Sequence, residues 1–207
     1  MSGPLGAVIA GGRSLRYGSP KALAHVGGKR IIDRVVNALR AVVDPIVLIA
    51  NDADLSGAVA LPARTDVVSG LGALGGIHSA LLWARETGRP GILAVACDMP
   101  FLQPALLARI LERASDEDAP DVVAPASEGP RGLEPLCAYY STTCIDAIER
   151  AVARDDRRVI GFHGDVRVAL VPLAEVTTFG RAELLFLNVN TPQERDTADR
   201  LASGDGA

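Results

Sequence analysis

Short apolar segments alternate with segments of helical periodicity along most of this 207-residue chain, and this alternation restricts the choice of fold more than any other feature. Leu5–Ala10, Ile46–Ile49 and Ile92–Ala96 are predicted strands, because each is a short apolar run that ends at a turn-forming or polar residue. Between the first two, apolar residues recur at helical spacing from Ile31 to Leu39. Such alternation predicts a mostly parallel sheet with right-handed crossovers and helices on both faces.

The rest of the chain continues the same pattern. Further strands are expected at Thr65–Val68, Asp121–Ala124, Leu136–Tyr140 and Val166–Val171, and further helices from the glycine-rich turn Ser69–Gly76 through Trp83, from Pro104, over Thr142–Val152 and from Pro192. No internal repeat is present. We therefore expect a single α/β domain over residues 1–207.

Composition narrows the class of protein. Hydrophobic residues make up 48% of the chain and aromatic residues only 4%, which suits strands of Val, Leu, Ile and Ala that are buried on both faces. The net charge of −4 favours no nucleic-acid partner. Three scattered cysteines predict neither a disulfide framework nor a metal knuckle. With no signal peptide or membrane span in the sequence, we expect a cytoplasmic protein without a membrane partner.

A glycine-rich, basic loop follows the first predicted strand, from Ala10 to Lys21. Its glycines allow backbone N–H groups to approach phosphate oxygens, and Arg16 and Lys21 add positive charge. The loop lacks the Gly-Lys-Ser/Thr ending of a P-loop. The pattern therefore favours a polyphosphate site of another kind, with a solvated strand-to-helix turn as the structural alternative.

A carboxylate, Asp98, stands at the end of the most clearly buried predicted strand. A carboxylate at a strand end is suited to Mg²⁺, which prefers hard oxygen ligands and would assist nucleotidyl transfer. The alternative is a turn or helix-capping aspartate before Pro100. Because ligands bind beyond the carboxyl ends of parallel strands, we expect Ala10, Asn51 and Asp98 to converge on one cleft.

With these features in place, the sequence resembles the MobA-like nucleotidyltransferase family, and within it the molybdenum cofactor guanylyltransferases. The resemblance runs from about Leu5 to Glu194 and is carried by Gly11-Gly12, Arg16, Gly18, Lys21, Cys97-Asp98-Met99-Pro100, Gly72-Ala73-Leu74-Gly75-Gly76-Ile77, Glu134-Pro135-Leu136-Cys137-Ala138-Tyr139 and Asn188-Val189-Asn190-Thr191-Pro192. The family differs from this chain at Tyr17, Pro20 and Ala73, where Met, an acid and Pro are usual.

The resemblance implies a Rossmann-like three-layer sandwich of the nucleotide-diphospho-sugar transferase type. It implies transfer of GMP from GTP to molybdopterin or Mo-molybdopterin with release of pyrophosphate, and Mg²⁺ as the cofactor. Molybdoenzyme chaperones would be further partners. The implied nucleotide-binding residues are Ala10, Gly11, Gly12, Lys21, Asn51, Asp66 and Asp98. The resemblance further implies Asp98 for Mg²⁺, Arg16 with Lys21 and Asp98 for catalysis, and Glu134, Asn188 and Asn190 for the acceptor, with the two asparagines facing either the acceptor or the metal.

Other functions stay open at this stage. A molybdopterin cytidylyltransferase, or a transferase acting on a sugar phosphate or phospholactate, would keep the chemistry and change the substrates. The run from Gly70 to Gly75 formally matches the dinucleotide-binding fingerprint of oxidoreductases, with Asp98 at a suitable distance beyond it. That function would leave the first loop and the Asn-rich segment without a role. A nucleotide-binding module without activity is the last alternative, although the presence of Asp98 argues against it.

Overall fold

The computed structural model describes residues 3–10 and 21–203. Its main elements follow the alternation expected from the sequence. In chain order they are β1 (Leu5–Ala10), β2 (His25–Val26), β3 (Lys29–Arg30), α1 (Ile31–Arg40), β4 (Ile46–Ala50), α2 (Ala53–Ala58), β5 (Ala63–Arg64), α3 (Ala73–Glu86), β6 (Gly91–Ala96), α4 (Pro104–Ala114), β7 (Val122–Pro125), β8 (Cys137–Ser141), α5 (Cys144–Ala153), β9 (Val168–Val171), α6 (Leu173–Val176), α7 (Ala182–Leu185) and α8 (Pro192–Ser203), with short 3₁₀ turns at Lys21–Leu23 and His163–Asp165.

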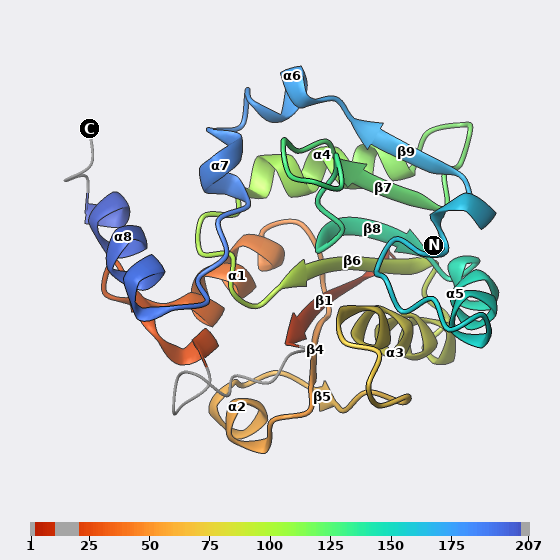
Figure 1. The fold of residues 1–207 in the computed structure, drawn as a ribbon, viewed down its shortest axis with the longest axis horizontal. Coiled ribbons are helices and arrows are strands. Elements are labelled where there is room, and N and C mark those ends of the chain that lie inside the picture. Colours follow the sequence, from red (N-terminus) through yellow and green to blue (C-terminus); the bar gives the residue numbers. More distant parts are fainter. Residues whose placement is uncertain (1–2, 11–20, 204–207) are drawn as a thin grey trace.

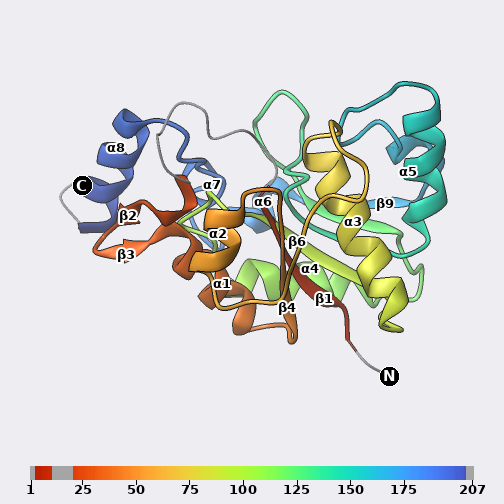
Figure 2. The same ribbon diagram turned by 90° about the horizontal axis from the view of Figure 1, so that it is seen from below.

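A seven-stranded sheet forms the middle layer, in the order β5-β4-β1-β6-β8-β7-β9 (Figure 1). Strand β8 runs antiparallel to both of its neighbours, and the other pairings are parallel. Helices α3 and α5 cover one face of the sheet and α1 and α4 the other (Figure 2). The expected three-layer sandwich with a mostly parallel sheet is therefore confirmed.

The alternation of side chains along the central strands creates two separate cores. In β1, Ala7 and Ile9 belong to the core beneath α3 and α5, whereas Val8 belongs to the core beneath α1 and α4. Both faces are apolar because helices cover both, which explains why the strands are continuous hydrophobic runs. Among the described residues, none of the helices combines the length and apolar composition that a membrane span requires.

The prediction of a strand over Thr65–Val68 is wrong. The chain pairs with β4 slightly earlier, at Ala63–Arg64, and this two-residue strand lies at the edge of the sheet. Beyond it, the backbone N–H groups of residues 66 and 67 donate to the side-chain oxygens of Asn51 and Ser79, at 2.9 and 2.8 Å. These side chains satisfy the backbone in place of a neighbouring strand.

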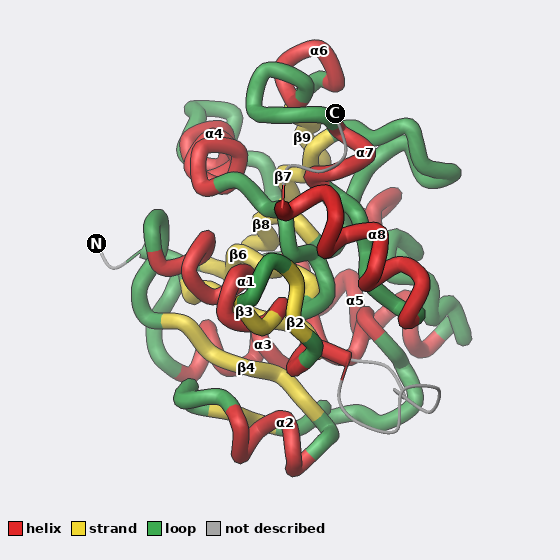
Figure 3. The backbone as a smooth tube through the Cα atoms, turned by 90° about the vertical axis from the view of Figure 1, so that its left-hand side faces the viewer, coloured by secondary structure: helices red, strands yellow, loops and turns green. Residues whose placement is uncertain are grey.

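The carboxyl ends of β1 and β6 meet where the strand order changes direction. After β1 the chain adds β4 and β5 on one side, and it then crosses to place β6 on the other side. In open α/β sheets, such a switch point is where ligands bind. The β2–β3 hairpin and helix α8 lie beside this edge, which Figure 3 shows from the front.

Helix α8 begins with a reciprocal capping arrangement. The Thr191 hydroxyl accepts a hydrogen bond from the N–H of Glu194 (3.2 Å), and the Glu194 carboxylate accepts one from the N–H of Thr191 (3.0 Å). With Pro192 at the first helical position, this is a capping box that fixes where the helix starts. The Glu194 carboxylate also accepts from the N–H of Asn190 (2.7 Å), so the cap orders the residues just before the helix.

One test of the sheet concerns Gly91, the first residue of β6. A Cβ atom at this position would lie 2.3 Å from the carbonyl oxygen of Tyr140 in the neighbouring strand. The Cβ atom would be attached directly to the backbone of β6, and the oxygen belongs to the paired backbone of β8, so neither can move away easily. Gly91→Ala is therefore expected to lower the free energy of unfolding by about 1–3 kcal/mol, as overpacking does. Urea denaturation measures the change. The control is Gly57→Ala in α2, where no atom lies within 4 Å and a helical alanine should be neutral or stabilising. Equal midpoints for the two variants would contradict the close contact.

Candidate active site

Lys21, Asp98 and Asn190 meet at the switch point, although they come from distant parts of the sequence. The Lys21 ammonium donates hydrogen bonds to the Asp98 carboxylate and to the Asn190 side-chain oxygen, the latter at 2.5 Å. The Asp98 side chain is only 10% exposed and that of Lys21 is 23% exposed. A partly buried ion pair at this edge places one fixed positive and one fixed negative charge where a ligand would arrive.

Asp98 is held in place by the strands around it. The N–H of Cys97 donates to the carbonyl of Ile9 in β1 (3.2 Å), which continues the parallel pairing of β6 with β1. The carbonyl of Asp98 accepts from the N–H of Val189 (3.0 Å). Helix α4 starts later, at Pro104, with Gln103 before it. Asp98 is therefore not a helix cap, and its carboxylate serves the ion pair with Lys21.

The segment 188–190 is fixed at both ends. The bond from Val189 to Asp98 attaches it to β6, and the capping bond from Glu194 attaches Asn190 to helix α8. The Asn188 side-chain amide donates to the carbonyl of Phe186 (3.0 Å), whereas the Asn190 side-chain oxygen accepts from the Lys21 ammonium. The two asparagines therefore have different neighbours, although the sequence predicted one shared role.

Asn51 and Asp66 form a second cluster, beside the carboxyl end of β4. The Asn51 side chain donates to one oxygen of Asp66 (2.7 Å) and accepts from the Asp66 N–H (2.9 Å). The other Asp66 oxygen, Oδ1, is buried and has no hydrogen-bond partner within the described part of the chain. It lies near the first turn of α3, where a Cβ on Gly76 would be 3.8 Å away. A buried acceptor without a donor is rare in proteins, and it marks a position where a ligand could donate.

Glu134 lies close enough to Asp98 for the two negative charges to interact. Burial is the main cause that raises the pKa of the Glu134 carboxyl, and the charge of Asp98 raises it further. One carboxylate oxygen accepts from the N–H of Leu136 (3.0 Å), and the carbonyl of Leu136 in turn accepts from the N–H of Ala96 at the end of β6. Glu134 is thus anchored to the same strand that ends at Asp98.

The remaining predicted residues divide into two groups. Ala10 is the last residue of β1 and pairs with Ala50 of β4, so it lies at the same edge of the sheet. Gly11, Gly12 and Arg16 lie outside the described residues. Of the expected strand-end residues, Ala10 and Asp98 are thus at the switch point, and Asn51 lies one strand further along.

The donor set is compatible with a magnesium ion. No group of three or more His, Cys, Asp or Glu side chains that could hold a metal occurs among residues 3–10 and 21–203. Mg²⁺ does not need such a group, because it is usually held by one or two carboxylates together with substrate phosphates and waters. The Asp98 carboxylate and the Asn190 amide oxygen, which meet at Lys21, are hard oxygen ligands of that kind.

Other residues that invite chemical interpretations have structural explanations. Burial raises the pKa of the Cys97 thiol to about 12, which makes it unreactive, and Cys137 and Cys144 are buried as well. His78 is buried in α3 and its ring lies 3.2 Å from the Glu149 carboxylate. The charged run at residues 155–158 forms exposed Asp–Arg pairs.

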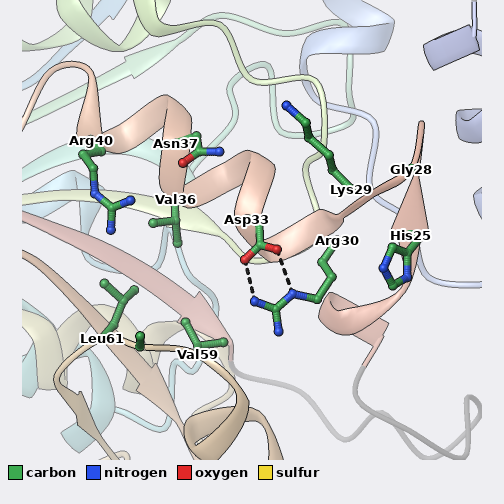
Figure 4. Close-up of a pocket in the computed structure, with 11 residues that line it drawn as sticks. His25, Gly28, Lys29, Arg30, Asp33, Val36, Asn37, Arg40, Val59 and Leu61 are labelled. Carbon is green, nitrogen blue, oxygen red and sulfur yellow. Dashed lines mark hydrogen bonds and ion pairs between the residues drawn. The ribbon is translucent and has the colours of Figure 1, made fainter.

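A separate groove of about 560 Å³ lies between α1 and the segment that follows α2 (Figure 4). Its lining includes Lys29, Arg30, Asp33 and Arg40, and Arg30 binds both oxygens of Asp33 at 2.7 and 2.8 Å. Lys21 and Asp98 do not line this groove. Its size alone therefore does not make it the active site.

Sequence reasoning missed Glu194, which orders Asn190 and caps α8. The signal was present in the spacing Thr-Pro-Gln-Glu, because a threonine followed three residues later by a glutamate is the pattern of a capping box. It also missed the contact of Val189 with Asp98. That contact leaves no trace in sequence spacing, since it joins backbone atoms of residues far apart in the chain.

Comparison of the sequence with known proteins identifies the family to which the chain belongs. Residues 6–167 match the family model of the MobA-like NTP transferase domain. The chain is 34% identical over 201 residues to the molybdenum cofactor guanylyltransferase of Desulfosudis oleivorans, covering 96% of each protein. It is 36% identical over 189 residues to a Pelotomaculum thermopropionicum protein named probable molybdenum cofactor guanylyltransferase, covering 91% of this chain and 88% of that protein.

A solved structure extends the comparison to the fold. The molybdopterin-guanine dinucleotide biosynthesis protein A of Archaeoglobus fulgidus superposes with a TM-score of 0.76 at 26% identity, covering 97% of this chain and 99% of that one. The family match covers both Lys21 and Asp98. The chain therefore belongs to the MobA-like NTP transferase family and is a nucleotidyltransferase.

Proposed function

We propose that this enzyme transfers GMP from GTP to the terminal phosphate of molybdopterin, with release of pyrophosphate. The observation that supports this most directly is the meeting of Lys21, Asp98 and Asn190 at the switch point of the sheet. The names of its relatives, molybdenum cofactor guanylyltransferases, agree with the proposal. The carboxylates of Asp66 and Glu134, one on each side of this cluster, offer hydrogen-bond acceptors to the two substrates.

In the proposed reaction, an oxygen of the acceptor phosphate attacks the α-phosphorus of GTP. A new P–O bond forms, the bond from the α-phosphorus to the bridging oxygen breaks, and pyrophosphate leaves with the electron pair. Lys21 binds and neutralises the triphosphate, and Asn190 keeps the ammonium in position through its 2.5 Å hydrogen bond. No protein nucleophile is needed, because the acceptor phosphate is already ionised. Catalysis then consists of positioning and charge stabilisation.

We further propose that Asp98 and the triphosphate together hold Mg²⁺, with Asn190 available as a further oxygen ligand. When bound, the ion supplies additional neutralisation of the charge that develops on the phosphates. The nearly buried position of Asp98 supports this role, because electrostatic interactions are stronger away from bulk water. Arg16, which precedes Lys21 in the sequence, is proposed to add positive charge.

Asp66 is the residue proposed to select the base. Guanine presents two adjacent N–H donors on its pairing edge, and a carboxylate can accept both, whereas cytosine presents a single amino group there. The buried Oδ1 atom of Asp66 has no donor within the described residues, and the bonds from Asn51 hold the carboxylate in position. A cytosine could supply only one of these two donors, so it would bind the Asp66 carboxylate more weakly than guanine.

Competition between GTP and CTP tests the substrates. With molybdopterin and Mg²⁺, pyrophosphate release should favour GTP by roughly a hundredfold or more. Asp66→Asn should lower this preference by about tenfold to a hundredfold, because an amide group cannot accept both guanine donors. The exposed Asp54→Asn in α2 is the matched control and should leave the preference unchanged. A wild-type preference for CTP would make the protein a cytidylyltransferase, and release only with a sugar phosphate would replace the acceptor.

A further inference from the structure

Helix α8 is connected to Lys21 by two separate routes, one through the ammonium group and one through the backbone. The first route runs from the start of the helix. The Glu194 carboxylate accepts from the N–H of Asn190 (2.7 Å), and the Asn190 side-chain oxygen accepts from the Lys21 ammonium (2.5 Å). The second route runs from the end of the helix through the β2–β3 hairpin. Both ends of the lysine therefore depend on where α8 lies.

The backbone route begins at the Asp199 carboxylate, which accepts from the N–H of Gly27 in the turn between β2 and β3 (2.7 Å). Ahead of the hairpin, the carbonyl of Ala24 accepts from the N–H of Ile31 (2.9 Å) at the start of α1. The N–H of Ala24 in turn donates to the carbonyl of Lys21 (3.1 Å). The backbone of Lys21 is thereby attached to the same hairpin that α8 binds.

A small apolar core fixes α8 against the hairpin, and Figure 3 shows the two elements side by side. Fully buried side chains from the hairpin, from the start of α1, from the segment before α8 and from α8 itself form this core: Val26, Ile31, Val189 and Ala198. A Cβ on Gly27 would lie 2.8 Å from the Cβ of Ala202, so the hairpin turn also contacts the last turn of the helix. Because such cores are closely packed, α8 is a firm support.

Glu194 is the residue through which this support reaches the ammonium. One of its oxygens accepts from the N–H groups of both Asn190 and Thr191, at 2.7 and 3.0 Å, and these two bonds fix the backbone just before the helix. Thr191 supplies the other half of the capping box, because its hydroxyl accepts from the N–H of Glu194 (3.2 Å). The two halves differ in one respect: it is the Glu194 carboxylate that binds the N–H of Asn190.

We propose that Glu194 is a positioning residue for GTP, which fixes Asn190 and thereby sets the direction in which the Lys21 ammonium meets the triphosphate. The inference rests on the proposed binding of GTP by Lys21. Without the Glu194 carboxylate, the ammonium would keep its ion pair with Asp98 and lose the fixed position of its second acceptor. The ligand would then have to order the ammonium itself, which lowers its affinity.

Isothermal titration calorimetry with GTP and Mg²⁺ tests this role in the full chain. We expect Glu194→Ala to raise the Kd for GTP by about threefold to tenfold, the usual effect of one lost hydrogen bond. Glu194→Gln should stay within about twofold of the wild type, because its amide oxygen can still accept from both N–H groups. In the Lys21→Ala background, Glu194→Ala should cause no further loss, since the group that it positions is absent. Equal losses in the two backgrounds would overturn the proposal.

Thr191→Val is the matched control, because it removes the other half of the capping box and leaves the Glu194 carboxylate in place. Both Thr191→Val and Glu194→Ala should lower the midpoint of thermal unfolding, as the loss of a helix cap does. We expect the Kd for GTP to rise only in Glu194→Ala. If the two variants weaken GTP binding equally, Glu194 only caps the helix and the proposal fails.

A second measurement needs no substrate. The chain contains only two lysines, Lys21 and Lys29, so NMR of isotope-labelled lysine ammonium groups gives at most two signals. The signal that disappears in Lys21→Ala belongs to the active site, and the exposed Lys29 is the internal reference. Glu194→Ala should shift the Lys21 signal and speed its hydrogen exchange with water, whereas Thr191→Val should leave it unchanged. An unchanged Lys21 signal in Glu194→Ala would contradict the positioning role.

The two measurements separate this inference from the function on which it rests. If the wild type does not bind GTP, or if Lys21→Ala binds it as tightly as the wild type, the proposed function of Lys21 fails. The ammonium signals still decide in that case whether Glu194 orients Lys21. If the wild type binds GTP through Lys21 and Glu194→Ala binds it equally well, only the role of Glu194 fails.

Discussion

Asp98→Asn is expected to lower the rate of nucleotidyl transfer by about a hundredfold to a thousandfold, the range found when one electrostatic group is removed from a catalytic site. The substitution keeps the size of the side chain and removes the charge that pairs with Lys21 and that we propose to hold Mg²⁺. Pyrophosphate release measured across a magnesium titration would show both the loss of rate and a higher magnesium requirement.

The matched control for this variant is Asp146→Asn, on an exposed position of α5. It removes the same charge from a helix on the outer layer, so its transfer rate should equal that of the wild type. Thermal unfolding should show that both variants are folded, because Asp98 follows β6 and its main-chain bond to Val189 does not involve the carboxylate. Turnover of Asp98→Asn within a few-fold of the wild type would exclude the metal role.

Lys21→Ala is expected to weaken GTP binding by about tenfold to a hundredfold, because hydrogen bonds to a charged group are worth about 1.5–3 kcal/mol. The ammonium is held by Asp98 and Asn190 at the strand ends, so it is positioned before the triphosphate arrives. Isothermal titration calorimetry with GTP and Mg²⁺ gives the change in Kd.

Lys29→Ala provides the comparison for Lys21. Lys29 is an exposed lysine of the β2–β3 hairpin and lines the separate groove of Figure 4. Both variants change the net charge of the protein equally, so a general electrostatic effect would weaken GTP binding in both. We expect a large effect only for Lys21. Equal affinities of Lys21→Ala and the wild type would refute its phosphate contact.

The layered fold was predictable because it depends on patterns that are local in sequence. The apolar runs that became β1, β4 and β6 are buried on both faces, and such runs can be recognised without knowledge of their neighbours. The convergence of Ala10 and Asp98 followed from one rule about where parallel strands end. Edge strand β5 was misplaced because its two residues are exposed and carry no apolar signal.

The parts of the site that the sequence did not reveal depend on contacts between distant segments. Nothing in the spacing of Asp66 indicates that Asn51 would bind it twice or that one of its oxygens would lack a donor in the described structure. The reversal of β8, which brings Glu134 to the end of β6, is likewise a property of the whole sheet. Family resemblance named Glu134 and Asn188, but the cavity of about 250 Å³ that Glu134 lines with Phe186, and the bond from Asn188 to the Phe186 carbonyl, required the three-dimensional arrangement.

The hydrogen bond from Lys21 to Asn190 spans 169 positions of the chain, and this has a consequence for biosynthesis. At translation rates of about 5–20 residues per second, Asn190 is made on the order of ten to thirty seconds after Lys21. The strands β1, β4 and β6 can pair during that interval, but the ammonium group lacks one of its two partners until the segment before α8 is released from the ribosome. The nascent enzyme therefore acquires its layers first and the complete Lys21–Asp98–Asn190 cluster last.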